Sequence, residues 1–255
     1  MSIASAFADN GKRAALMPYL MGGHPSIEES VSAGLAAVDA GADLLELGVP
    51  FSDPLADGPV IHAAAVEALA AGATPHGVLG VCERLAVGVP VVLMVYANIV
   101  LTTGASAFAM RAASAGAAGL IVPDLPHDEA DEVRVACDSE GLALVPLVAP
   151  TTTPERIASI GADARGFVYT VSLTGTTGER DELPDGLAET VERVRASTEV
   201  PVAVGFGIST PEQARTVAEV ADGVIVGSRV VRAAGEGGAA AVGSVVAELA
   251  DALRD

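Results

Sequence analysis

Short apolar runs alternate with segments of helical periodicity along the whole chain. The runs are rich in Val, Ile, Leu and Ala, and several are apolar at nearly every position, as expected of parallel strands covered on both faces. The pattern predicts eight strands, at Ala14–Met21, Asp43–Gly48, Pro90–Tyr96, Gly119–Pro123, Ala143–Val148, Gly166–Thr170, Pro201–Gly205 and Gly223–Val226.

The segments between these runs carry apolar residues every three or four positions, which predicts helices. Ser26 and Glu29 have the spacing of a capping box, and a threonine precedes a first-turn proline at Thr153-Pro154 and at Thr210-Pro211. Eight strand–helix units in 255 residues predict an α/β fold, a single (β/α)8 TIM barrel domain over residues 1–255. A doubly wound open sheet is the alternative, although it usually has fewer strands at this length.

Two connections are longer than the others, and both follow the carboxyl end of a predicted strand. They run from Val49 to Ala73 after the second strand and from Val171 to Gly186 after the sixth. Long loops in a compact domain are commonly functional, and barrel enzymes carry their active sites at the carboxyl ends of the strands. The sequence therefore predicts a site built from extended loops after strands 2 and 6.

The chain is strongly acidic, with 33 Asp and Glu against 14 Lys and Arg and a formal charge of −19. Such a surface repels nucleic acid and anionic membranes. No apolar run is long enough to span a bilayer, and the first residues do not read as a signal peptide. We therefore expect a cytoplasmic protein without nucleic-acid or membrane partners, in which Cys82 and Cys137 are reduced and buried.

Lys12 is the only lysine, and it precedes the first predicted strand. An enzyme that forms a Schiff base, or that holds pyridoxal phosphate, needs a lysine inside its site. The four histidines are far apart in the sequence and show no metal-site spacing. These observations argue against Schiff-base chemistry and predict no metal site.

Glu46 places a carboxylate within the apolar strand Asp43–Gly48. Apolar neighbours would raise the pKa of this carboxyl and suit it to general acid–base catalysis. The alternative is a buried salt bridge or a strand-end residue that faces water. The loop that follows adds Asp53 and Asp57 among three prolines and several apolar residues. Turn formation explains each aspartate singly, whereas an apolar loop beside a carboxylate can cover an apolar substrate.

Glycines follow the seventh and eighth strands, in the segments Gly205–Pro211 and Gly227–Arg229. Backbone N–H groups at this place commonly bind phosphate in barrels, and ordinary turns are the alternative. Near Tyr169, the segment Ser172–Gly178 is rich in small and hydroxyl residues, as in a mobile lid or a plain flexible loop. Together these features predict acid–base chemistry on a phosphorylated small molecule.

The segment Leu45–Pro59, LELGVPFSDPLADGP, resembles the signature of the tryptophan synthase alpha chain family. The resemblance covers essentially the whole chain, through Pro18-Tyr19, Met94–Asn98, Pro123–Pro126, Thr174–Gly178, Gly205–Ile208 and Gly227-Ser228. It implies a (β/α)8 barrel that cleaves indole-3-glycerol phosphate to indole and glyceraldehyde 3-phosphate in tryptophan biosynthesis. It also implies a beta chain as partner in an α2β2 assembly, with pyridoxal phosphate in that partner and no cofactor in this chain.

The resemblance assigns roles by motif position. Glu46 would protonate indole C3 and relay a proton from the glycerol hydroxyl, Asp57 would hold the indole N–H, and Tyr169 would position the substrate. The remaining assignments are Tyr19, Tyr96, Phe206 and Ile208 in the indole pocket, Thr177 in the lid, Gly178, Gly207, Gly227 and Ser228 on the phosphate, and Pro50, Asp53, Asn98 and Pro126 against the beta chain.

Three positions depart from the family pattern. His24 stands where many members have Asp, Leu173 where some have Arg, and Thr176 where Val is common. These departures bear on the lid and on coupling to the partner more than on proton transfer. Two alternatives remain open: another phosphate-binding barrel enzyme of the same pathway, and a non-catalytic subunit that binds the phosphate ligand and activates a partner.

Overall fold

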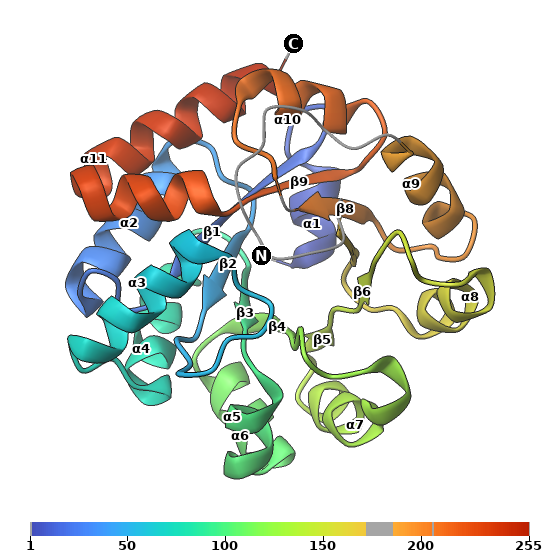
Figure 1. The fold of residues 1–255 in the computed structure, drawn as a ribbon, viewed down its shortest axis with the longest axis horizontal. Coiled ribbons are helices and arrows are strands. Elements are labelled where there is room, and N and C mark those ends of the chain that lie inside the picture. Colours follow the sequence, from blue (N-terminus) through green and yellow to red (C-terminus); the bar gives the residue numbers. More distant parts are fainter. Residues whose placement is uncertain (1, 172–185, 206, 255) are drawn as a thin grey trace.

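Parallel strands form a ring at the centre of the molecule, and helices surround the ring (Figure 1). The structure is a computed structural model that describes residues 2–171, 186–205 and 207–254. The hydrogen-bonded order of the strands is β5-β4-β3-β2-β1-β9-β8-β7-β6. Their bounds are β1 (Ala15–Met21), β2 (Leu45–Gly48), β3 (Val91–Met94), β4 (Ala117–Ile121), β5 (Ala143–Leu144), β6 (Leu147–Val148), β7 (Val168–Val171), β8 (Val202–Gly205) and β9 (Gly223–Val226).

The ring closes through an interrupted strand. β5 and β6 stand at the two ends of the strand order, and they are the two halves of the predicted strand Ala143–Val148. Between them, the Val145 N–H donates to the Leu120 carbonyl of β4, and the Pro146 carbonyl accepts from the Tyr169 N–H of β7, both at 2.9 Å. The break falls at a proline, which has no N–H to donate. The predicted barrel is therefore confirmed, and the open sheet is wrong.

The helices begin where the sequence predicts their caps. The Thr153 and Thr210 hydroxyls each accept a hydrogen bond from the N–H of the third helical residue. The Ser26 hydroxyl also accepts from the Glu29 N–H, but the Glu29 carboxylate accepts from the Ser26 hydroxyl, so only half of the predicted capping box forms. The helices are α1 (Ile3–Ala8), α2 (Ile27–Asp39), α3 (Pro59–Ala70), α4 (Pro75–Leu85), α5 (Ala97–Thr103), α6 (Ala105–Ser114), the 3-10 turn η1 (His127–Glu129), α7 (Asp131–Ser139), α8 (Pro154–Asp163), α9 (Leu187–Arg195), α10 (Pro211–Ala218) and α11 (Ser228–Ala252).

One segment that the sequence presents as a loop contains a helix. In the connection from Val49 to Ala73, residues 49–58 are irregular, whereas Pro59–Ala70 form α3. This helix is rich in alanine, so its faces differ little in polarity and the apolar periodicity gives no signal. The predicted loop after the sixth strand lies mainly at residues 172–185, outside the described residues.

The barrel interior is packed, and α1 covers one end of it. Ile3 and Ala6 of α1 pack with side chains from inside the ring, and the ring of Phe7 lies 5.6 Å from that of Phe167. The interior side chains include Met17, Leu44, Val92, Ile121, Val145 and Ile225. Because Phe167 directly precedes β7, α1 lies at the amino ends of the strands, and the carboxyl ends remain accessible for a site.

Within the described residues, every helix is too short or too polar to cross a bilayer. Cys82 and Cys137 are free thiols with buried side chains, as predicted.

The single lysine belongs to the amino-terminal end of the barrel. Lys12 Nζ lies 2.8 Å from Asp43 Oδ1, and the second oxygen of Asp43 accepts from the Leu16 N–H at 2.7 Å. The two side chains are only 5% and 11% exposed. This buried ion pair joins the residues before β1 to those before β2, at the end of the barrel opposite to the carboxyl ends of the strands.

We predict that Lys12→Met lowers the free energy of unfolding by about 3–5 kcal/mol, because Asp43 is left buried without its cationic partner. Arg84→Met is the matched control, since the Arg84–Glu28 pair is equally short at 2.7 Å but 48% and 75% exposed. Exposed pairs contribute at most about 1 kcal/mol. Urea denaturation measures both variants, and equal losses would contradict a special role for the buried pair.

Candidate active site

Glu46 lies inside the barrel because successive side chains of β2 point alternately outward and inward. Leu45 and Leu47 pack outward in the core between the sheet and the helices, so the side chain between them points inward. Glu46 is 1% exposed, and among the described residues neither of its carboxylate oxygens has a hydrogen-bond partner. Burial, and secondarily the charge of Asp57, raise the pKa of Glu46 to about 8. The carboxyl group therefore holds a proton at neutral pH.

Asp57 reaches the same cavity from the loop between β2 and α3. Its Oδ1 accepts a hydrogen bond from the Tyr96 hydroxyl at 3.0 Å, and that hydroxyl accepts one from the Ala56 N–H at 3.1 Å. Phe51 stacks on the Tyr96 ring with centroids 5.2 Å apart. Burial raises the pKa of Asp57, while the hydrogen bond from Tyr96 opposes that shift. Asp57 is thus better solvated by its neighbours than Glu46 is.

Two tyrosines flank Glu46, and each needs a glycine beside it. Tyr19 is paired in register with Glu46 across β1 and β2, and Tyr169 also lines the cavity. A Cβ atom at Gly48 would lie 2.0 Å from the Tyr19 hydroxyl, and one at Gly205 would lie 2.3 Å from the Tyr169 hydroxyl. Burial raises the pKa of both tyrosines well above the ordinary value. Both hydroxyls therefore remain protonated donors inside the site.

The loops after β8 and β9 supply another part of the cavity wall. Gly207, with a φ of +81°, and the buried Ile208 come from the first loop, and Gly227 and Ser228 come from the second. α11 starts at Ser228 without a side-chain cap, whereas α10 is capped at its amino end by its own residues. The first N–H groups of α11 are therefore not occupied by a capping side chain, and a helix amino terminus favours an anion.

The sequence-derived assignments fall into three groups. Glu46, Asp57, Tyr169, Tyr19, Ile208, Gly207, Gly227 and Ser228 line one cavity, and Tyr96 lies behind Asp57. Thr177, Gly178, Phe206, Leu173 and Thr176 lie outside the described residues. Asp53, Asn98 and Pro126 are exposed, whereas Pro50 is buried.

Sequence reasoning missed part of the cavity wall. Ala56, Ile61, Met94, Pro123 and Ile225 also line it. Ile61 belongs to the helix that the periodicity did not reveal. Ala56 stands one residue before Asp57, and Pro123 stands within a segment that carries the family resemblance, so both had a positional signal.

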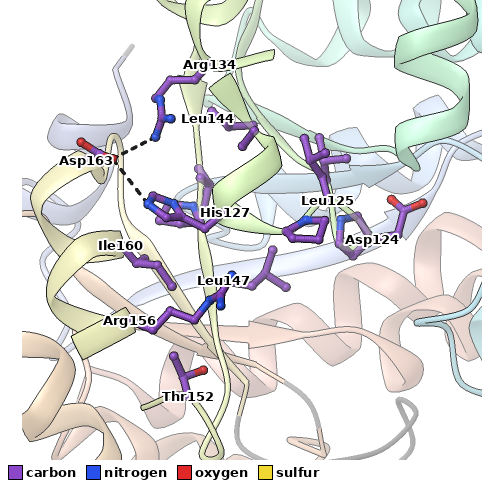
Figure 2. Close-up of a pocket in the computed structure, with 16 residues that line it drawn as sticks. Asp124, Leu125, His127, Arg134, Leu144, Leu147, Thr152, Arg156, Ile160 and Asp163 are labelled. Carbon is purple, nitrogen blue, oxygen red and sulfur yellow. Dashed lines mark hydrogen bonds and ion pairs between the residues drawn. The ribbon is translucent and has the colours of Figure 1, made fainter. Parts of the chain in front are cut away.

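A larger cavity of about 390 Å³ lies between α7 and α8 (Figure 2). Most of its charged groups are paired with charged side chains. Asp163 lies 3.4 Å from His127 and 2.9 Å from Arg134 (Figure 2). Arg156 lies 2.5 Å from Asp128, and Asp124 accepts a hydrogen bond from the Ala97 N–H. Because these charges are mutually neutralised, we assign the chemistry to the smaller cavity that contains Glu46 and Asp57.

A parallel barrel with a protonated carboxyl, a second carboxylate and an uncapped helix amino terminus at the carboxyl ends of its strands is typical of acid–base enzymes that act on phosphorylated small molecules. Comparison with known proteins narrows this class. A family model described as the tryptophan synthase alpha chain matches residues 6–252. The chain belongs to the tryptophan synthase alpha chain family.

Individual relatives agree along the chain. The tryptophan synthase alpha chain of Carboxydothermus hydrogenoformans is 48% identical over 233 residues, covering 90% of this chain and 87% of the relative. That of Synechococcus sp. strain CC9902 is 49% identical, covering 92% and 88%. A chain in a structure of Mycobacterium tuberculosis tryptophan synthase superposes with a TM-score of 0.93 at 41% identity, covering 99% of this chain and 98% of that one.

The raised pKa of Glu46 predicts how stability depends on pH. In the unfolded chain the carboxyl titrates near 4.5, and in the folded chain near 8. Between these values the folded state holds one more proton, so the free energy of unfolding of the wild type falls as pH rises. Because glutamine does not titrate, Glu46→Gln should gain stability relative to wild type by about 1.4 kcal/mol per pH unit across this range, and no further above it.

Urea denaturation at several pH values measures this difference. Glu83→Gln, the same substitution at an exposed glutamate on α4, is the control. A difference between Glu46→Gln and wild type that stays constant from pH 5 to 8 would mean that the carboxyl ionises normally.

Proposed function

We propose that this chain cleaves indole-3-glycerol phosphate to indole and glyceraldehyde 3-phosphate by a retro-aldol reaction. The observation that carries the proposal is the pairing of a protonated Glu46 with a more strongly hydrogen-bonded Asp57 in one cavity. Two carboxyl groups in different environments can take different roles in one reaction. Family membership gives the substrate, and the site gives the residues that act on it.

The reaction needs an electron sink before its carbon–carbon bond can break. The Glu46 carboxyl donates its proton to indole C3, which yields a C3-protonated indolenine with positive charge at nitrogen. The Asp57 carboxylate accepts the indole N–H hydrogen bond and stabilises that charge. Glu46, now ionised, takes the proton of the adjacent glycerol hydroxyl. The bond between C3 and the glycerol carbon then breaks, its electrons restore the aromatic ring, and the hydroxyl carbon becomes the aldehyde.

The two tyrosines and the backbone donors orient the substrate for this sequence. Tyr169 and Tyr19 lie beside Glu46, and their neutral hydroxyls can hold the glycerol chain against it. Gly207, Gly227 and Ser228 supply N–H groups for the phosphate at the amino end of α11. By family resemblance we also assign Gly178 to the phosphate, Phe206 to the indole pocket and Thr177 to the lid. The phosphate then fixes the indole end of the substrate at the two carboxyl groups.

Membership of this family implies a beta chain as partner. We propose an α2β2 assembly, working in the cytoplasm, in which the beta chain holds pyridoxal phosphate and receives indole through an internal passage. The buried ion pair of Lys12 with Asp43 supports this division, because the only lysine of the chain is committed to the amino-terminal end of the barrel. Asp53, Asn98 and Pro126 are exposed around the carboxyl ends of β2, β3 and β4. We propose that they face the partner, together with Leu55, which is 84% exposed.

The reaction itself is tested by indole release from indole-3-glycerol phosphate. Glu46→Gln and Asp57→Asn should each lower turnover by roughly 10²–10⁴-fold, because each removes an acid–base or charge-stabilising group. Asp128→Asn, which alters an exposed carboxylate that pairs with Arg156 beside the cavity between α7 and α8, is the control. Wild type and variants are assayed with and without a beta chain.

Three outcomes would overturn the proposal in different ways. Folded wild type that releases no indole in either condition is not this lyase. If it also activates the beta chain, it is a binding subunit; if another phosphorylated compound is converted, it is a different barrel enzyme. Unchanged turnover in Asp57→Asn would remove that residue from the mechanism.

The partner surface is tested at the loop after β2. Asp53→Ala should weaken association with the beta chain by about tenfold, because it removes an exposed charge from the proposed interface. Titration of one chain into the other by calorimetry measures the affinity. The control is Asp138→Ala, which alters an exposed aspartate near the carboxyl end of α7. Equal affinity of both variants would place the interface elsewhere.

A further inference from the structure

One side chain joins the two loops to which we assign phosphate binding. Arg229 is the second residue of α11. One of its terminal nitrogens donates to the Ser209 carbonyl at 2.7 Å, and the other donates to Glu248 Oε2 at 2.5 Å. Ser209 lies in the loop after β8, and Glu248 lies in the second part of α11, which follows a kink at Gly238. The arginine therefore spans from one proposed phosphate loop to the helix that follows the other.

Ser209 is held from both of its sides. Its N–H donates to Gln213 Oε1 at 2.8 Å, and the same oxygen accepts from the Thr210 N–H at 3.1 Å. With its carbonyl bound to Arg229, the short turn from Gly207 to Thr210 is fixed to α10 on one side and to α11 on the other. The turn and the first residues of α11 cannot shift relative to one another without breaking these bonds.

We infer that Arg229 is a positioning residue for the phosphate of the substrate. It holds the Gly207–Ile208 backbone at the distance from Gly227 and Ser228 that lets N–H groups of both loops point at one anion. The inference rests on the proposed phosphate site. An arginine suits this role because its planar guanidinium can bond two acceptors in fixed directions. Without it, binding would have to order the two loops, and affinity would fall by that cost.

Glu248 distinguishes positioning from simple attraction. If Arg229 acted by its positive charge alone, removing the neighbouring carboxylate would expose that charge and strengthen phosphate binding. If Arg229 acts through the Ser209 carbonyl, losing Glu248 frees the guanidinium to move and weakens phosphate binding. Glu248→Gln therefore gives effects of opposite sign under the two accounts.

The experiment measures two ligands on the full-length chain by calorimetry. Glycerol 3-phosphate probes the phosphate site, and indole, which has no phosphate, probes the rest of the cavity. Arg229→Gln should weaken glycerol 3-phosphate binding by about tenfold, the effect of losing one hydrogen bond to a charged group. It should weaken indole binding less, because Ile208 is the one residue of this turn that we assign to the indole pocket. Glu248→Gln should also weaken glycerol 3-phosphate binding, but by less than Arg229→Gln does. In turnover of indole-3-glycerol phosphate, the loss should appear in KM more than in kcat.

Two further variants separate the possible failures. Arg195→Gln is the matched control, because Arg195 also bonds a carboxylate in another element, Asp222, at 2.5 Å, but at the amino end of β9. Ser228→Pro removes one proposed phosphate donor at the first helical position, where proline is tolerated. An effect of Ser228→Pro without one of Arg229→Gln would leave the phosphate site standing and overturn the role of Arg229.

Other outcomes are equally decisive. Tighter glycerol 3-phosphate binding by Glu248→Gln would overturn the positioning role of Arg229. The same conclusion would follow if Arg229→Gln and Arg195→Gln weakened the binding of both ligands equally. Unchanged binding in both Ser228→Pro and Arg229→Gln would overturn the proposed phosphate site together with this inference. If Arg229→Gln does not fold, Glu248→Gln still decides by the sign of its effect.

Discussion

The buried carboxyl group of Glu46 is the constraint around which the site is arranged. Without a hydrogen-bond partner among the described residues, its charged form is poorly solvated and its proton is retained to a pKa of about 8. The neighbouring groups are compatible with a protonated Glu46. Tyr19 and Tyr169 are neutral donors, and Asp57 accepts a hydrogen bond from Tyr96. β2 therefore places a proton donor in the cavity at a pH at which a glutamate exposed to water would be an anion.

A partnerless carboxyl group persists only where the surrounding backbone is stiff. The two leucines on either side of Glu46 anchor β2 in the outer core, and Tyr19 is seated against Gly48, where no side chain larger than hydrogen fits. At the other end of the barrel, α1 and the Lys12–Asp43 pair join the first strands. Lys12 and Asp43 are paired with each other there, whereas in the site the Glu46 carboxyl has no hydrogen-bond partner among the described residues. Stability is thus concentrated at the amino ends, and reactivity at the carboxyl ends.

The sequence is informative where a property depends on neighbours along the chain. The barrel, the caps of α8 and α10, and the anomalous position of Glu46 all follow from local patterns. What depends on partners in space does not: Tyr96 holds Asp57 from a strand end about forty residues away, and Gly48 is required by a tyrosine on another strand. For other reasons, the sequence does not predict two further features. The alanine-rich α3 has no clear apolar periodicity, and the strand that contains Pro146 is interrupted by a single missing N–H.

An acidic chain that binds a phosphorylated substrate must solve a charge problem, and its geometry offers a consistent answer. The formal charge of −19 opposes an anionic ligand at long range, and the cavity contains two carboxyl groups of its own. Keeping Glu46 protonated removes one negative charge. In the proposed site, the backbone N–H groups of α11 would stabilise the phosphate without adding a side-chain charge that Asp57 would attract. Arg229, a cation beside the loops after β8 and β9, is bound to Glu248 and to a carbonyl. Because binding couplings are reciprocal, a phosphate held in the proposed site would also favour the protonated form of Glu46, which is the form that the proposed mechanism requires.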